Sequence, residues 1–406
     1  MPSGTRNRLA TIPSDLPGSG CLGSVGVDKQ LKISLSSQMT KAFPNGFLWG
    51  SASAAHQIEG NNKNSDWWRH EKDEGTPAKD HSGLACNSYE LFDDDFELIS
   101  DSGQNAVRFS IEWARIEPFP GEFSYQEIDH YREMIGAARD RGLTPFVTLH
   151  HFTNPIWFAD KGGWDNDEAV EVFGRYCLTV AKTLGDLLEY VCTINEPSIV
   201  ASVGYLMGYF PPRRRDLNAF LKVTKNLIKS HGAAVEATRK ATDAKVGICL
   251  ALSDIVPADE SEESESLREL IYHRSTGVYV DALTTGEIRD LGEPEYVPSI
   301  AGTDDFVGIQ YYSRLVAGRR RDGRPNIGIT HDVKEDERVT QMGWPWHPIG
   351  MSRVIDDVKR TELPIYVTEN GIATDDDDER VEYVTKHLDQ IHQTIERGAD
   401  VRGYFY

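Results

Sequence analysis

The sequence Ile365-Tyr-Val-Thr-Glu-Asn-Gly371 is a short β-branched run that ends in a carboxylate, Glu369, and a glycine. An apolar run of this length bounded by turn residues predicts a buried strand. A second run, Tyr-Val-Cys-Thr-Ile-Asn-Glu-Pro over residues 190–197, places Glu196 at the same point. Either glutamate alone could begin a loop or cap a helix. Because carboxylates at the carboxyl ends of barrel strands are typical of active sites, the pair together favours a catalytic pocket.

Similar apolar runs recur along the chain and alternate with segments of helical periodicity. Eight strands are predicted near residues 48, 108, 147, 192, 248, 307, 367 and 404. Helices are predicted over residues 87–101, 124–141, 166–184, 217–242, 265–283, 347–360 and 381–397. Alternation of this kind indicates a parallel sheet, and eight repeats with polar residues at the strand ends predict an α/β fold of the (β/α)8 TIM-barrel type. The competing doubly wound sheet is disfavoured, because no Gly-x-Gly-x-x-Gly follows the first strand.

Composition limits the kinds of partner. The formal net charge of −21 argues against nucleic acid and against anionic membrane surfaces, and favours a small neutral or cationic molecule. No apolar run approaches the roughly 18 residues of a membrane span, and the N-terminus has no apolar signal core. The five cysteines are scattered without metal-ligand spacing, which indicates packed thiols in a reducing compartment. We therefore expect a cytoplasmic protein.

No motif for a bound cofactor or metal is found in the chain. There is no glycine-rich phosphate loop and no His-Glu-x-x-His, and the adjacent His150 and His151 do not by themselves make a metal site. Residues 1–40 are rich in Ser, Gly, Thr and Pro without sustained periodicity, so we expect a disordered leader followed by a single barrel over residues 41–406.

The strand-end motifs, taken in order, resemble those of glycoside hydrolase family 1, the β-glucosidase and β-galactosidase family. Asn-Glu-Pro alone is a weak signal, whereas the ordered set from about residue 43 to the C-terminus is specific. The matching segments are Phe43–Gly60, Arg108–Trp113, Thr148–His151, Gly162–Trp164, Thr193–Pro197, Asp305–Ser313, Met342–Trp344 and Thr368–Thr374.

The resemblance implies a retaining β-glycosidase in which Glu196 is the acid/base and Glu369 the nucleophile. A retaining mechanism requires two carboxyl groups roughly 5–5.5 Å apart. One of them must be ionised to attack the anomeric carbon and the other must be protonated to release the leaving oxygen. We therefore expect a positive or hydrogen-bonding partner beside Glu369.

The resemblance also assigns neighbours to the two glutamates. Arg108 matches the family arginine beside the nucleophile, Tyr312 its tyrosine donor, and Asn195 the residue that binds the sugar 2-hydroxyl. Two of them have a plainer interpretation: Arg108 could serve a structural ion pair, and Tyr312 could be ordinary packing.

Three further residues match the family's sugar contacts. Gln57 and His151 match binders of sugar hydroxyls, and Trp344 resembles the aromatic wall on the leaving-group side. Alternatively, Gln57 could cap a helix, His151 could be a satisfied core histidine, and Trp344 could belong to the core.

Three departures from the family pattern affect the expected pocket. Gln310 stands where the family usually has Asn, which lengthens the side chain by one methylene. Phe152 stands where the family usually has Trp, which removes an indole N–H donor near the sugar. The sequence ends at Tyr406, before the family's Trp-Ser-x-x-Asp-Asn-Phe-Glu-Trp motif, so we expect an incomplete glycone pocket, poor folding, and weak or no hydrolysis of β-glucosides. We also expect Phe405, Tyr406 and the apolar side chains near Phe47 to be unusually exposed.

The function expected from this resemblance is hydrolysis of terminal β-linked glucosides or related β-D-glycosides by double displacement, without a cofactor. Two alternatives stay open: a 6-phospho-β-glucosidase, and a non-catalytic sugar-binding barrel. The expected partner is a small-molecule β-glycoside, and the oligomeric state is not predicted.

Overall fold

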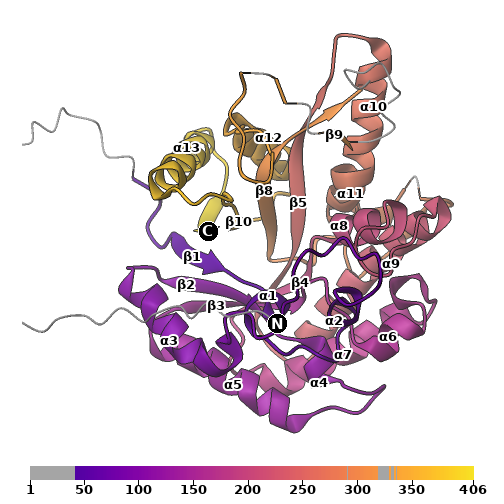
Figure 1. Cartoon of the computed structure of the whole chain (residues 1–406), viewed down its shortest axis with the longest axis vertical. Coiled ribbons are helices and arrows are strands. Elements are labelled where there is room, and N and C mark those ends of the chain that lie inside the picture. The colour runs from indigo at the N-terminus through magenta and orange to yellow at the C-terminus, as the bar shows by residue number, and fades with distance from the viewer. Residues whose placement is uncertain (1–41, 290, 319–328, 331–332, 335) are drawn as a thin grey trace, which may run out of the picture. The chain divides into compact units, whose positions relative to one another are not determined.

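Eight parallel strands close into a barrel in the computed structural model, which describes residues 42–289, 291–318, 329–330, 333–334 and 336–406 (Figure 1). The barrel strands are β1 (Leu48–Ala52), β2 (Ala106–Ser110), β3 (Thr144–His150), β4 (Tyr190–Asn195), β5 (Lys245–Pro257), β8 (Phe306–Ala317), β10 (Ile365–Glu369) and β11 (Val401–Phe405). Each strand pairs in parallel with the next, and β11 pairs back onto β1. The predicted (β/α)8 barrel is confirmed, and each predicted strand lies where its apolar run placed it.

Helices occupy the connections between the strands, as the alternating pattern predicted. The longer helices are α3 (Ser88–Asp101), α5 (Tyr125–Asp140), α7 (Ala169–Leu184), α9 (Leu217–Arg239), α10 (Glu262–Tyr272), α11 (Val278–Thr285), α12 (Ile349–Val358) and α13 (Asp377–Glu396). The single helix predicted over residues 265–283 is wrong in detail, because a wider π-type turn at His273–Gly277 separates α10 from α11. No helix in the described part of the chain is long and apolar enough to cross a membrane.

Short helices follow several barrel strands and shape the loops at their carboxyl ends. They are α1 (Ala55–Ile58), α2 (Asp66–His70), α4 (Trp113–Ile116), α6 (Ile156–Asp160) and α8 (Pro197–Ala201). Helices of one turn carry too weak a periodicity to be predicted from sequence. These segments matter because barrel enzymes build their sites from the loops at this end.

Aromatic side chains fill the barrel near the start of several strands. Phe146 stacks on Tyr190 with ring centroids 4.1 Å apart, and Phe405 lies 4.8 Å from Phe146. Phe306 and Tyr366 complete this buried cluster. Because the rings occupy the interior, space for a ligand is left at the carboxyl ends of the strands.

The expected exposure of the last strand is corrected by this packing. Phe405 is fully buried because its ring points into the barrel and packs against Gly50. A methyl group on Gly50 would lie 2.5 Å from this ring, so only glycine leaves room for it. Phe47 is also buried, against Trp49, with ring centroids 4.6 Å apart. Tyr406 is 36% exposed, as expected.

Two strands continue beyond the barrel. The second halves of β5 and β8 remain paired as far as Pro257 and Ala317, and the short strand β9 (Ile329–Thr330) adds to β8 in the antiparallel sense (Figure 1). Two strands of two residues each, β6 (Glu287–Ile288) and β7 (Glu295–Tyr296), pair in the antiparallel sense. Residues 43–406 form one compact unit, and the predicted leader, residues 1–40, lies outside the described residues.

Candidate active site

A cavity of about 480 Å³ contains both predicted catalytic glutamates at the carboxyl ends of the strands. Glu369 is the last residue of β10, and Glu196 directly follows β4 with a left-handed φ of 47°. The cavity, called here the substrate pocket, is lined by Ala52, Ser53, Gln57, His151, Phe152, Glu196, Tyr312, Thr340, Met342, Trp344, Glu369, Asn370, Gly371, Ile372, Ala373 and Tyr406. The structure thus brings together residues from opposite sides of the barrel.

Three hydrogen-bond donors converge on Glu369. Its Oε1 accepts from Nη1 of Arg108 at 2.5 Å and from Nε2 of Gln310 at 2.6 Å. Its Oε2 accepts from the hydroxyl of Tyr312 at 2.6 Å. Hydrogen bonds and a nearby guanidinium stabilise the negative charge of a carboxylate. This environment suits an ionised group.

Arg108 lies in the middle of β2 and is fully buried. Its Nη2 donates to Oδ1 of Asn195 at 2.5 Å, so one guanidinium holds both Glu369 and the residue before Glu196. Gln310 donates to the same Oδ1 at 2.7 Å. The Nδ2 of Asn195 has no hydrogen-bond partner among the described residues, although it is buried. The donors on its oxygen fix the orientation of the amide.

Glu196 has a different environment from Glu369. Burial raises the pKa of Glu196 well above its ordinary value, and the negative charge of Glu369 raises it further. Arg108 opposes this rise but does not reverse it. The pocket therefore contains one carboxylate surrounded by donors and a second carboxyl group that favours its protonated form.

The remaining predicted residues lie on the wall of the substrate pocket. His151 is 9% exposed, and burial lowers its pKa well below the ordinary value, with Arg108 adding to the effect, so its imidazole is neutral. Gln57 is exposed on α1. The ring of Trp344 meets that of Tyr312 edge to face, with centroids 5.7 Å apart. All eight predicted site residues thus line the pocket or, like Arg108 and Asn195, lie buried beneath it.

Some residues of the site were not among those predicted. Gln310 was noted only as a departure from the family pattern, yet it contacts Glu369 directly. Its position opposite Glu369 follows from the register of β8 and β10, which the local sequence pattern does not encode. Tyr406 and the segment 370–373 also line the pocket. Among the described residues, no group of three or more His, Cys, Asp or Glu side chains is placed to hold a metal ion.

The chain is similar to known glycosidases over most of its length. A family model described as glycosyl hydrolase family 1 matches residues 39–406. β-Glucosidase A of Thermotoga maritima is 32% identical over 396 residues, which cover 90% of this chain and 88% of the relative. An aryl-phospho-β-D-glucosidase of Bacillus subtilis is 29% identical over 418 residues, with 90% and 88% covered. The solved structure of a β-glycosidase from Pyrococcus horikoshii superposes with a TM-score of 0.83 at 38% identity, covering 91% of this chain and 85% of that one.

Proposed function

The chain belongs to glycosyl hydrolase family 1, and on that basis we propose that it hydrolyses terminal β-linked glucosides or related β-D-glycosides with retention of configuration. The observation that carries the proposal is the contrast between two glutamates in one pocket. Glu369 accepts three hydrogen bonds, whereas burial and Glu369 raise the pKa of Glu196. Retaining glycosidases require such a pair.

In the first step, the carboxylate of Glu369 attacks the anomeric carbon of the bound sugar. Glu196 donates its proton to the glycosidic oxygen as the bond from that oxygen to the anomeric carbon breaks. The leaving group departs as a neutral alcohol, and the sugar stays attached to Glu369 as an ester. Protonation matters because an alkoxide is a poor leaving group.

In the second step, Glu196, now ionised, accepts a proton from a water molecule. The water oxygen attacks the anomeric carbon, and the ester bond to Glu369 breaks. The products are a sugar of the original β configuration, ionised Glu369 and protonated Glu196. The second inversion at the anomeric carbon cancels the first.

The neighbouring residues support these steps. Arg108 and Tyr312 hold the two oxygens of Glu369, which fixes the direction of attack. The unpartnered Nδ2 of Asn195 is a donor for the sugar 2-hydroxyl, a contact that strengthens in the transition state. Gln57 and His151 are positioned to bind other sugar hydroxyls from the pocket wall.

A 6-phospho-β-glucoside is the second candidate substrate, because the relative from Bacillus subtilis is named as an aryl-phospho-β-D-glucosidase. Phosphate recognition in proteins relies on arginine, lysine or backbone N–H groups. None of the residues described as lining the substrate pocket is an arginine or a lysine. Among these lining residues, no cationic side chain supports a phosphorylated sugar over a plain one.

The experiment compares p-nitrophenyl β-D-glucoside with its 6-phosphate, using the purified chain. We expect turnover of the plain glucoside, and proton NMR should show the β-anomer of glucose before mutarotation. Turnover of the phosphorylated substrate alone would reassign the sugar. Initial release of the α-anomer would contradict the retaining mechanism. The Glu369→Ala variant gives the background rate of p-nitrophenyl β-D-glucoside hydrolysis.

A further inference from the structure

The segment that follows β3 forms part of the wall of the substrate pocket. His151 and Phe152 both line the pocket that contains the two glutamates. Phe152 has a φ of 68°, a left-handed conformation that a bulky side chain rarely adopts. Such a conformation persists only where surrounding contacts determine it. The question is which contacts hold this segment in place.

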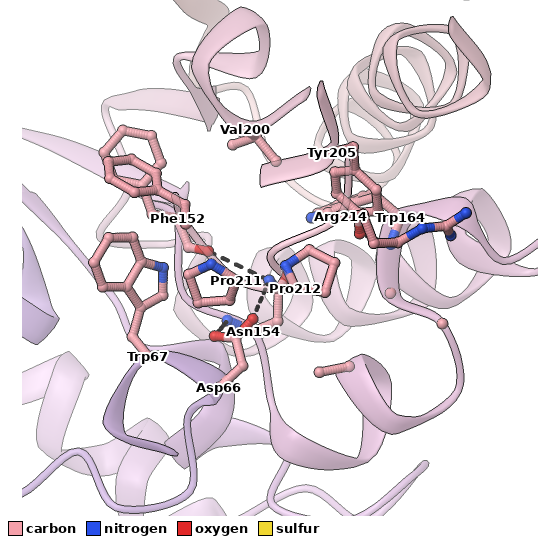
Figure 2. Close-up of a pocket in the computed structure, with 14 residues that line it drawn as sticks. Asp66, Trp67, Phe152, Asn154, Trp164, Val200, Tyr205, Pro211, Pro212 and Arg214 are labelled. Atoms are coloured by element: carbon pink, nitrogen blue, oxygen red, sulfur yellow. Dashed lines mark hydrogen bonds between the residues drawn. The ribbon is translucent and has the colours of Figure 1, made fainter. Parts of the chain in front are cut away.

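Packing behind the segment is incomplete. A second cavity, of about 90 Å³, lies there and is lined by Asp66, Trp67, Phe152, Asn154 and residues from α6, α8 and the loops beyond (Figure 2). Phe152 therefore lines a cavity on each side. Phe152 packs near the rings of Trp67 and Phe210, but the void removes atoms that would complete its van der Waals contact. Directional contacts are needed.

Asp66, at the start of α2, supplies those contacts. Its carboxylate accepts from the backbone N–H of Asn154 at 2.9 Å and from the side-chain Nδ2 of Asn154 at 2.8 Å. In return, the backbone N–H of Asp66 donates to the carbonyl of Asn154 at 2.9 Å. Asp66 and Asn154 are 5% and 7% exposed, so water does not compete freely for these bonds.

Asn154 extends the contact to both sides of His151. Its Nδ2 donates to the carbonyl of Phe152 at 3.3 Å, and its Oδ1 lies 3.1 Å from Nε2 of His150, the last residue of β3. Figure 2 shows the dashed lines that connect Asp66, Asn154 and the backbone of Phe152. One side-chain amide thus contacts the residues on both sides of His151.

We propose that Asp66 is a positioning residue for the substrate pocket, which acts through Asn154 to hold His151 and Phe152 against the sugar. Asp66 does not line the substrate pocket itself. The inference rests on the proposed function, because it assigns the wall of that same site. Its effect should appear in sugar binding and leave the chemistry of Glu369 and Glu196 in place.

The test uses Asp66→Ala and Asn154→Ala, which cut the same link from either side, together with their double variant. We expect each single variant to lower kcat/KM for p-nitrophenyl β-D-glucoside by about 10-fold or more, mainly through KM, as a small displacement of binding groups can do. The double variant should show no further loss, since both changes remove one interaction. Asp66→Asn, which keeps an acceptor for the backbone N–H of Asn154, should retain most of the affinity.

The matched control is Asp304→Ala. Asp304 is 7% exposed and contacts His231 at 3.2 Å, but it lies before β8, at the opposite end of the barrel from the pocket. It should leave KM unchanged. Unchanged KM in folded Asp66→Ala, or additive losses in the double variant, would overturn the inference. If Asp66→Ala does not fold, Asn154→Ala decides in the same way.

Amide hydrogen exchange gives a readout that does not need turnover. The backbone N–H of Asn154 donates to Asp66, so Asp66→Ala should accelerate exchange at that amide and leave the amides of β10 protected. Unchanged exchange at Asn154 would count against the role of Asp66. A wild-type chain that turns over no β-glycoside would instead contradict the proposed function, and the exchange result would still decide whether Asp66 holds the segment.

Discussion

Gln310 and Glu369 face each other in the register of β8 and β10, and Nε2 of Gln310 lies 2.6 Å from Oε1 of Glu369. The same nitrogen lies 2.7 Å from Oδ1 of Asn195. One amide therefore connects the proposed nucleophile with the residue next to the proposed acid/base. Since both contacted atoms are acceptors, the orientation of the Gln310 amide is fixed by its neighbours.

Gln310→Leu should lower kcat/KM for β-glucosides by about 10- to 100-fold, because a hydrogen bond to a charged group contributes roughly 1.5–3 kcal/mol. The loss should appear on nitrophenyl substrates in steady-state assays. Gln341→Leu is the control, since Gln341 bonds only the exposed Asp375 in the contacts described for its side chain. Equal rates for Gln310→Leu and wild type would show that the amide does not assist Glu369.

Separate roles for the two glutamates predict different responses to the leaving group. Glu369→Ala should abolish turnover of every β-glucoside. Glu196→Ala should keep a fast first step on dinitrophenyl glucoside, whose leaving group needs no proton, and lose turnover of alkyl glucosides. Rapid-mixing kinetics on the two substrates would measure this. A full loss in both variants on the activated substrate would argue against the assignment.

We expect the pKa of Glu196 to set the high-pH limit of activity. Burial, together with the charge of Glu369, raises this pKa well above the ordinary glutamate value of about 4.3. The acid must be protonated, so kcat/KM for an alkyl glucoside should fall only as pH rises through this raised pKa. On dinitrophenyl glucoside, whose leaving group needs no proton, the high-pH limb in kcat/KM should be absent even in the wild type. A wild-type limb at the ordinary carboxyl range would contradict the described environment.

Asp66 predicts a pH dependence of stability. Burial raises its pKa to about 7 from an ordinary value of 3.8. Between these values the folded protein binds a proton that the unfolded chain has released, so the contribution of Asp66 to stability falls as pH rises through this range. The Tm of the wild type should therefore fall relative to the Tm of Asp66→Asn as the pH rises from 4 to 7. A difference that is constant with pH in calorimetry would show that Asp66 does not titrate there.

Much of the fold was predictable because the barrel repeats one local pattern. Most barrel strands are short buried runs. Glu196 and Glu369 each stand at the carboxyl end of such a run in the sequence. Strand order then follows from the preference for right-handed crossovers between parallel strands. The two carboxylates proposed to be catalytic could therefore be placed at strand ends without coordinates.

Contacts between distant segments were not predictable in the same way. Asp66 and Asn154 are 88 positions apart, and neither carries a local signal for the other. The burial of Phe405 depends on the space left by Gly50 on a neighbouring strand. The contact of Gln310 with Glu369 depends on the register between two strands. Such relationships are set by tertiary geometry, which periodicity does not encode.

The most direct test of the central claim is the identification of the residue that carries the sugar. The chain is incubated with 2,4-dinitrophenyl 2-deoxy-2-fluoro-β-D-glucoside, whose fluorine slows both steps and whose activated leaving group restores the rate of the first. It is then digested with protease and analysed by tandem mass spectrometry. The account predicts one equivalent of fluoroglucosyl label, attached to Glu369, in step with loss of activity. Label on another residue, or turnover of nitrophenyl glucoside without any covalent label, would contradict it.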